Sequence, residues 1–206
     1  MIRDGVEILS SQTEFEGFFR LRSYRLRYRR YDGAWSAPHS REVFERGHAV
    51  GVLPYDPVRD EVVLIEQFRH GAFIGGAENP WLLEIVAGII DPGHDAEAVI
   101  RREMREEAGL DIGRLVRCRR FFTSPGGSSE TFTLYIGAVD ASAAGGVHGL
   151  DDEAEDIMVH RLALREAIAL LDSDRANNAP LIIALQYLAL NTNDLRNLLR
   201  DHQPQG

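Results

Sequence analysis

Three glutamates, Glu103, Glu106 and Glu107, stand at positions i, i+3 and i+4 of one short segment. In a helix of 3.6 residues per turn these positions share one face. Like charges at this spacing repel one another, which favours their neutralisation by divalent cations or by arginines, and Arg102 and Arg105 can supply part of the positive charge. Carboxylate oxygens are hard ligands that suit Mg²⁺ or Mn²⁺. The spacing therefore predicts a helix that presents carboxylates to a cation.

The same letters, RREMREE, also fit a plainer interpretation, because a surface helix rich in arginine and glutamate is usually a solvated, salt-bridged face. The residues before the segment decide against this. Gly88 is followed by Ile-Ile-Asp-Pro-Gly-His94, and seven residues then lead to Arg102. A glycine-containing loop at a fixed distance from a carboxylate helix favours the chemical interpretation.

The string from Gly88 to Leu110 resembles the Nudix box, in which a glycine, an intervening glutamate and the run REUxEExGU form a loop and a helix that hold divalent metals. His94 stands where the family pattern has its first glutamate. By resemblance, that position supports the loop and the start of the helix, so we expect activity to survive. We interpret His94 as a neutral loop residue that forms hydrogen bonds rather than as a metal ligand.

Further segments are similar to those of the ADP-ribose pyrophosphatases of this family, and together they span nearly the whole chain. They are EVFERGHAVGVLPYDPVRDEVVLIEQFRHGAF, NPWLLEIVAG, SPGGSSE and GLDDEAEDIMVHRL. The resemblance implies metal-dependent hydrolysis of a nucleoside diphosphate sugar, with ADP-ribose the expected substrate and AMP and ribose 5-phosphate the products. The implied cofactor is Mg²⁺, with Mn²⁺ as an alternative.

The resemblance also implies a set of metal ligands, namely the backbone carbonyl of Ala87 and the carboxylates of Glu103, Glu107 and Glu155. Glu106 is expected to assist catalysis in the same cluster. Bound metal would neutralise the diphosphate and lower the pKa of a water molecule, and a carboxylate would then take its proton. We expect Glu153 to be this base, because the acidic loop DDEAED can close over the metal. Glu155 and Glu153 can exchange roles.

Substrate contacts are expected from several places. Arg69 follows a predicted core strand, where its guanidinium can form paired hydrogen bonds with phosphate oxygens. The resemblance implies four more substrate-binding residues: Phe18, Arg41, Gly88 and Glu130. Phe18 and Arg41 would sandwich the adenine, one from each subunit, and Glu130 would approach the terminal ribose from the partner chain. The turn at 124–129 is interpreted as a plain connector.

Hydrophobic periodicity and turn residues predict the elements that position these groups. The strand pattern of residues 18–31 changes phase near Ser23, which predicts a bulge or bend there. Asp95 is expected to cap the carboxylate helix, and Gly109 to end it. The predicted strands are 18–31, 48–53, 61–68, 81–87, 115–123 and 131–139. The predicted helices are 96–108, 164–171 and 180–190, with a mobile loop at 141–149 and a frayed tail at 202–206.

These elements indicate the α/β class, and the resemblance specifies a Nudix fold with a mixed β-sheet sandwiched between helices. An antiparallel β element, residues 1–47, is expected to precede a catalytic domain, residues 48–206. By resemblance this element builds a homodimer. The dimer would contribute to the substrate pocket.

Composition excludes several other classes of protein. The net charge of −9 argues against nucleic-acid binding. All 23 basic residues are arginine, which excludes mechanisms that need a lysine amine. No segment has the roughly 20 apolar residues of a membrane span, and the amino terminus does not resemble a secretory signal. One packed or half-buried cysteine, Cys118, agrees with a cytoplasmic location.

Two alternatives stay open at this point. The chain can be a Nudix hydrolase of another nucleoside diphosphate sugar, which a substrate panel would reveal. It can also be a catalytically silent module that binds ADP-ribose, since the first glutamate of the box is replaced. The carboxylate density of the helix and of the loop favours the enzyme. A nucleic-acid-binding role for the arginine-rich strand ranks third.

Overall fold

The computed structural model describes residues 2–3 and 5–200, and the chain divides into two compact units. The first unit takes the chain up to His48 together with Phe122–Thr131. The second unit takes Ala49–Phe121 and the chain from Phe132 onward. The first unit therefore includes a segment from the middle of the chain that sequence analysis assigned to the catalytic part.

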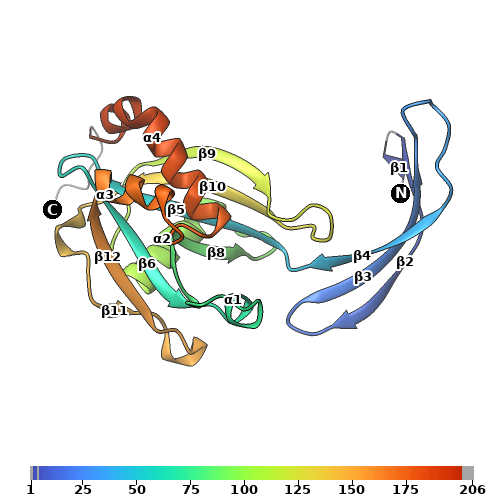
Figure 1. Ribbon diagram of the computed structural model, residues 1–206, viewed down its shortest axis with the longest axis horizontal. Coiled ribbons are helices and arrows are strands. Elements are labelled where there is room, and N and C mark those ends of the chain that lie inside the picture. The colour runs from blue at the N-terminus through green and yellow to red at the C-terminus, as the bar shows by residue number, and fades with distance from the viewer. Residues whose placement is uncertain (1, 4, 201–206) are drawn as a thin grey trace. The chain divides into compact units, whose positions relative to one another are not determined.

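The first unit is an antiparallel sheet in the order β1-β2-β3-β4 (Figure 1). Its strands are β1 (Ile2–Arg3), β2 (Val6–Glu16), β3 (Arg20–Tyr28) and β4 (His39–Glu45). The bulge predicted near Ser23 is wrong, because β3 pairs with β4 in unbroken register. The register shifts instead in β2, at Leu9 and Glu14, which are the extra residues of that strand.

The sheet of the first unit lacks a hydrophobic core of its own among the residues of its strands. None of residues 5–48 is buried, and Phe15, Phe18 and Tyr31 are largely exposed. Surface contacts between its strands take the place of a core. The guanidiniums of Arg27 and Arg29, for example, lie 4.8 and 4.4 Å from the centre of the Trp35 ring. A sheet built in this way is only marginally stable when it is alone.

The second unit is built on an eight-stranded sheet. Its main path is β11-β12-β6-β5-β10-β9, while β7 pairs with β6 and β8 pairs with β5. The strands are β5 (His48–Asp56), β6 (Glu61–Phe68), β7 (Trp81–Glu84), β8 (Val86–Ile90), β9 (Leu115–Phe122), β10 (Thr131–Ala138), β11 (Val147–His148) and β12 (Ile157–Ala163). Because β10 runs parallel to β5 and β12 antiparallel to β6, the sheet is mixed, as predicted.

Helices cover both faces of this sheet (Figure 1). Alternate residues of a strand point to opposite faces, so Val50 and Val52 pack toward α2 (Ala96–Ala108). Leu53 packs on the other face, with α4 (Ala179–Arg200). The expected fold, a mixed sheet between helices, is confirmed.

Helix α2 has the bounds that were predicted, and its ends explain why. The Asp95 carboxylate accepts a hydrogen bond from the Ala98 N–H at 3.1 Å, which caps the first turn. Gly109 adopts φ 65° and donates its N–H to the Arg105 carbonyl, which ends the helix in the left-handed conformation.

The other helices differ from the prediction. A short helix, α1 (His70–Ile74), was not expected, and α3 (Leu164–Ala169) passes into a 3₁₀ turn at Leu170–Asp172. The predicted helix 180–190 continues as α4 to Arg200 across a kink at Asn191. It continues because Leu195 and Leu199 are buried in the core.

Three smaller predictions have different outcomes. The 141–149 segment was expected to be a mobile loop, but it contains a 3₁₀ turn at Ala141–Ala143 and strand β11. The single strand predicted at 81–87 is two strands separated by Ile85. Residues 202–206 lie outside the described residues. Cys118 is buried, as predicted, and no described helix is long and apolar enough to cross a membrane.

Candidate active site

The carboxylates of α2 lie at unequal depth. The Glu107 residue is only 4% exposed, and the Glu103 side chain only 12%. Glu107 is held from the sheet, because the Ala87 N–H donates a hydrogen bond to its Oε2 at 3.2 Å. Glu106 is more exposed, at 26% of its side chain. The helix therefore points two of its acids inward, toward β8.

Gly88 makes room for Glu103. A Cβ at position 88 would lie 2.1 Å from Glu103 Oε1 and 2.6 Å from its carboxyl carbon, which is far inside van der Waals contact. The glycine therefore lets the carboxylate approach the β8 backbone. Gly88 lies in strand β8 rather than in a loop, and this steric requirement explains the glycine without reference to its backbone angles.

Arg102 bridges two of the glutamates of α2. Its Nη2 lies 2.6 Å from Glu103 Oε1, and its Nη1 lies 2.6 Å from Glu106 Oε2. Arg105, which was also expected to neutralise the cluster, instead pairs with Asp111 at 2.7 Å. Of these two arginines, Arg102 therefore faces the acids and Arg105 turns away.

The two inward acids hold their protons unusually well. Burial raises the pKa of Glu103 to about 7; Arg102 opposes the rise, and nearby glutamates, including Glu155 of the acidic loop, add to it. Burial also raises the pKa of Glu107 well above its usual value, against the hydrogen bond from Ala87. A cation bound beside these groups would therefore offset an existing electrostatic cost.

The acidic loop is tied to α2 through its backbone. Gly149, at φ 105°, donates its N–H to the backbone carbonyl of Glu106 at 3.1 Å. The Leu150 N–H donates to Glu155 Oε2 at 3.2 Å, and Ala154 adopts φ 55° between the two loop glutamates. Glu153 and Glu155 both raise the pKa of Glu103, so the structure brings helix and loop acids into one electrostatic cluster.

The donor set fits a hard divalent cation in its chemistry. Several carboxylates gather beside a glycine that admits them, and the charges of Glu103 and Glu155 add to the cost of ionising the buried Glu107. As they stand, no three acidic, histidine or cysteine side chains within residues 2–3 and 5–200 are arranged to hold a metal ion. Instead, Glu103 pairs with Arg102, Glu107 accepts a hydrogen bond from the Ala87 N–H, and Glu155 accepts one from the Leu150 N–H.

Arg69 lies within electrostatic reach of the cluster, since the charges of Glu107 and Glu155 both raise its pKa. It is paired with Glu84, which was not expected. Arg69 Nε lies 3.1 and 3.0 Å from the two Glu84 oxygens, and Nη2 lies 2.6 Å from Oε2. Gln67 Nε2 donates to the same Oε2 at 3.2 Å.

Three expected substrate contacts belong to the first unit. Phe18 is 87% exposed and packs edge-on against Phe19. Arg41 is exposed on β4 and donates to the Ser40 carbonyl at 2.8 Å. Glu130 is 8% exposed, and it accepts a hydrogen bond from Thr123 Oγ1 at 2.8 Å. Arg46 links two of these places, because it pairs with Glu130 at 3.3 Å and lies over the Phe19 ring, 5.3 Å from its centre.

Two loop interpretations need correction. His94 is exposed, and its side chain forms no hydrogen bond within the described part of the chain; its backbone N–H donates to the Asp91 carbonyl instead. The 124–129 turn is more than a connector, because β4 pairs with it. The Phe44 N–H donates to the Gly127 carbonyl at 2.8 Å, and Ser129 donates back to Phe44 at 3.2 Å.

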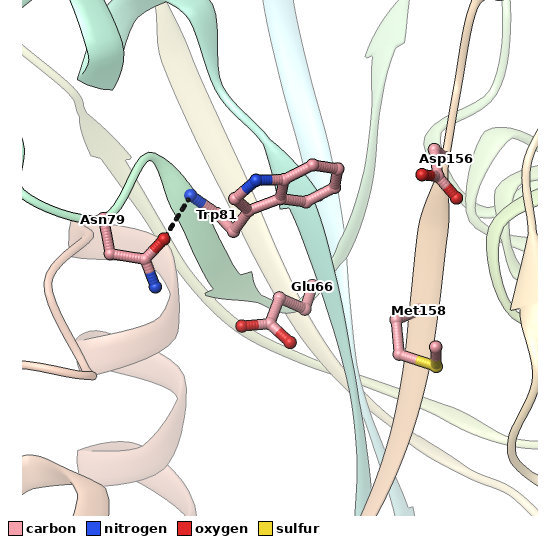
Figure 2. Close-up of a pocket in the computed structure, with 5 residues that line it drawn as sticks. All are labelled: Glu66, Asn79, Trp81, Asp156 and Met158. Carbon is pink, nitrogen blue, oxygen red and sulfur yellow. Dashed lines mark hydrogen bonds between the residues drawn. The ribbon is translucent and has the colours of Figure 1, made fainter.

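A pocket of about 420 Å³ opens elsewhere on the second unit, and none of the expected catalytic residues lines it (Figure 2). Its lining residues are Glu66, Asn79, Trp81, Asp156 and Met158. Glu66 and Met158 are paired across β6 and β12, on the face of the sheet opposite Gln67. The pocket is therefore separate from the carboxylate cluster.

Sequence analysis missed Glu84 and Gln67. Alternation offered a usable signal, because Gln67 and Arg69 share a strand face and Glu84 lies on the next strand along the chain. Their pairing, however, depends on the register of β6 and β7, which short-range patterns do not give.

The fold and the carboxylate helix define a Nudix-type protein. The NUDIX domain matches residues 45–185, and the chain belongs to the Nudix family. It is 48% identical over 195 residues to the ADP-ribose pyrophosphatase of Escherichia coli strain K12. The aligned residues cover 95% of this chain and 93% of that protein.

Two further comparisons give the range of the likeness. The GDP-mannose pyrophosphatase of Klebsiella pneumoniae is 32% identical over 184 residues, covering 89% of this chain and 91% of that protein. A crystal structure described as an ADP compounds hydrolase has a TM-score of 0.70 and 22% identity, covering 95% of this chain and 99% of that one. At that identity, the structural likeness supports the fold alone.

Proposed function

We propose that this chain hydrolyses the diphosphate bond of ADP-ribose and releases AMP and ribose 5-phosphate. The observation that carries the proposal is the 48% identity to ADP-ribose pyrophosphatases over 95% of the chain. The site agrees with this chemistry, because α2 turns Glu103 and Glu107 inward beside Gly88. Carboxylates gathered in this way suit a cation that binds diphosphate.

Mg²⁺, with Mn²⁺ as a substitute, is the cofactor in this proposal. The ligands would be the Ala87 carbonyl and the carboxylates of Glu103, Glu107 and Glu155. Bound there, the metal would neutralise the diphosphate and make water easier to deprotonate. Arg102 already supplies positive charge to Glu103 and Glu106, so a metal would compete with this arginine for Glu103.

Glu153 is the proposed base, and Glu106 assists through its contact with Arg102. The Glu155 carboxylate is fixed by the Leu150 N–H, as a ligand requires. The Glu153 side chain is exposed and forms no hydrogen bond within the described part of the chain, so it remains available to accept a proton. This difference supports the division of roles between the two loop glutamates.

Five residues are assigned to substrate binding. Arg69 would contact the diphosphate, since its charge already lies near Glu107 and Glu155. Gly88 would let the substrate approach the backbone of β8. Phe18 and Arg41, one from each subunit, would enclose the adenine, and Glu130 of the partner subunit would approach the terminal ribose.

A homodimer and a cytoplasmic location complete the proposal. We assign residues 1–47 to dimerisation and 48–206 to catalysis. Exposed aromatic side chains on a sheet with no buried residue between 5 and 48 support the dimer, since a second copy would cover them. A single buried cysteine agrees with a reducing compartment.

A substrate panel tests the proposal. With Mg²⁺ present, we expect AMP release from ADP-ribose to be faster than hydrolysis of GDP-mannose or other nucleotide sugars, and to be lost in Glu107→Gln. Glu97→Gln, on the exposed side of the same helix, is the matched control and should retain activity. Tight binding of ADP-ribose without turnover would contradict the enzyme and favour the silent module.

GDP-mannose is the second candidate substrate, because relatives that are 32% identical or more carry the name GDP-mannose pyrophosphatase. Preferential turnover of GDP-mannose in the same panel would retain the diphosphate chemistry and replace ADP-ribose as the substrate.

A further inference from the structure

The Arg69–Glu84 pair is a fixed and directional contact. The Glu84 carboxylate accepts hydrogen bonds from Nε and Nη2 of Arg69, which form one edge of the guanidinium. Within the described part of the chain, Nη1 has no hydrogen-bond partner. Two parallel contacts fix both the place and the rotation of a guanidinium, which a single contact does not do. Glu84 therefore determines which edge of Arg69 stays open.

The position of Glu84 follows from the sheet. Glu84 pairs with Ile65, and Leu82 pairs with Gln67, so the side chains of these residues share a face. Ile65 packs in the same cluster as Met104 of α2. Glu84 therefore lies on the face that carries the catalytic carboxylates.

Gln67 also contacts the Glu84 carboxylate. It is 6% exposed, and its amide donates to the same Glu84 oxygen that receives Arg69 Nη2. The Arg69 backbone is also fixed, because its N–H donates to the Pro80 carbonyl at 2.9 Å. The Glu84 carboxylate is thus anchored before it contacts the arginine, and the Arg69 side chain remains 45% exposed.

Other carboxylates attract the same guanidinium. Glu107 and Glu155 both act on the charge of Arg69, although neither forms an ion pair with it. An arginine released from Glu84 would move toward these two acids. There it would compete with a cation for its ligands and lose its orientation toward substrate.

We propose that Glu84 is a positioning residue that holds the Nε and Nη2 edge of Arg69, keeps this arginine away from Glu107 and Glu155, and presents Nη1 to a phosphate oxygen. The inference rests on the proposed diphosphate hydrolysis and deepens it. It assigns a role in substrate and metal binding to an acid that is neither a metal ligand nor a base.

A double-mutant cycle tests the kinetic part. We expect Glu84→Ala and Arg69→Ala each to lower kcat/KM roughly 10- to 100-fold, mainly through KM, because supporting residues of metal and substrate sites have effects of this size. The double variant should be no worse than Arg69→Ala, since Glu84 acts only through the arginine. If the two losses multiply instead, the proposal is wrong.

Metal binding supplies a readout that does not depend on turnover. Mn²⁺ titrations followed by electron paramagnetic resonance should show about tenfold weaker binding in Glu84→Ala and a return to the wild-type affinity in the double variant. If Glu84 is only structural, the Mn²⁺ affinity lost in Glu84→Ala will not return when Arg69 is also removed. That result would overturn the proposal. This readout stands even if the wild type hydrolyses none of the nucleotide sugars, an outcome that would defeat the proposed function alone.

A matched ion pair controls for general effects. Asp60 and Arg196 are paired across the second unit without contact to the cluster. Asp60→Asn should leave both kcat/KM and Mn²⁺ affinity unchanged. If Glu84→Ala does not fold, Glu84→Gln replaces it in the cycle. A neutral amide offers one acceptor oxygen, so the same pattern of suppression should appear with a smaller amplitude.

Discussion

The two acidic regions of this protein are built in opposite ways. The α2 glutamates are presented by a capped helix that packs on the core, and two of them point inward. The loop glutamates Glu153 and Glu155 flank Ala154, whose backbone is left-handed, and the Gly149 N–H ties the start of the loop to the Glu106 carbonyl of α2. A rigid part and a more adjustable part thus meet at one electrostatic cluster.

This difference agrees with the proposed roles, in which the helix holds a cation and the loop accepts a proton. A ligand must stay in place, and burial of Glu107 and its hydrogen bond from the Ala87 N–H would keep it there. A base must reach water and then release its proton, which suits an exposed loop residue such as Glu153. Variants that perturb one region at a time test this difference.

The largest effect should come from Glu107→Gln. Loss of the proposed metal ligand is expected to lower kcat about 1000-fold, because electrostatic stabilisation by a bound metal contributes several kcal/mol. Thermal unfolding in EDTA should show no loss of stability, since the amide retains an oxygen that can accept the Ala87 N–H and removes a buried acid that is costly to ionise. Retained activity would show that the helix cluster is not the metal site.

Parallel Glu153→Gln and Glu155→Gln variants sharpen the division within the loop. We expect Glu153→Gln to lower kcat about 100-fold with unchanged Mn²⁺ affinity, as for loss of a general base. Glu155→Gln should instead weaken Mn²⁺ binding. Titration calorimetry measures the Mn²⁺ affinity of both variants, and steady-state kinetics measures their kcat. The reverse pattern would exchange the two roles.

Gly88→Ala perturbs the helix region without changing its charge. The added Cβ would meet the Glu103 carboxylate at 2.1 Å, so this acid must move. We expect kcat/KM to fall roughly 10- to 100-fold, because small displacements of catalytic groups are costly. Gly71→Ala is the matched control, since a Cβ there meets nothing within 4 Å. Equal activity of the two variants would contradict the steric account.

Substitutions of Ala154 test whether the backbone conformation of the loop matters for activity. At φ 55° a β-branched residue is strongly disfavoured, so Ala154→Val should lower kcat about tenfold. Because the loop lies outside the core, the melting temperature should change little. Ala154→Gly, which tolerates the same angle, should stay within about threefold of wild type. A large loss of stability in the valine variant would mean that the loop is part of the rigid body.

Cys118 reports whether these variants leave the core intact, and here no effect is expected. Burial raises the pKa of its thiol to about 12, so fewer than about one in a thousand molecules carry the thiolate at pH 8.5. Alkylation should therefore be negligible at pH 8.5 and should rise as the pH approaches 12 or when the protein unfolds. Rapid labelling of a variant at pH 8.5 would show that its core has opened.

Local patterns account for what was predicted well. The face of α2 follows from helical periodicity, and its bounds follow from Asp95 and Gly109, whose effects act within a few residues. The continuation of α4 past Asn191 was missed for the opposite reason. It depends on burial of Leu195 and Leu199 in a core assembled from distant strands.

The family and the shared face of the three helix glutamates could be predicted from the amino-acid sequence, because both rest on residue spacing within short segments. The partners of the charged groups required the folded structure. Arg102 bridges Glu103 and Glu106 while Arg105 pairs with Asp111, and periodicity alone does not distinguish these two arginines. The pairing of Glu84 with Arg69 depends on the register of β6 and β7, which brings residues distant in the sequence together and which no local pattern specifies.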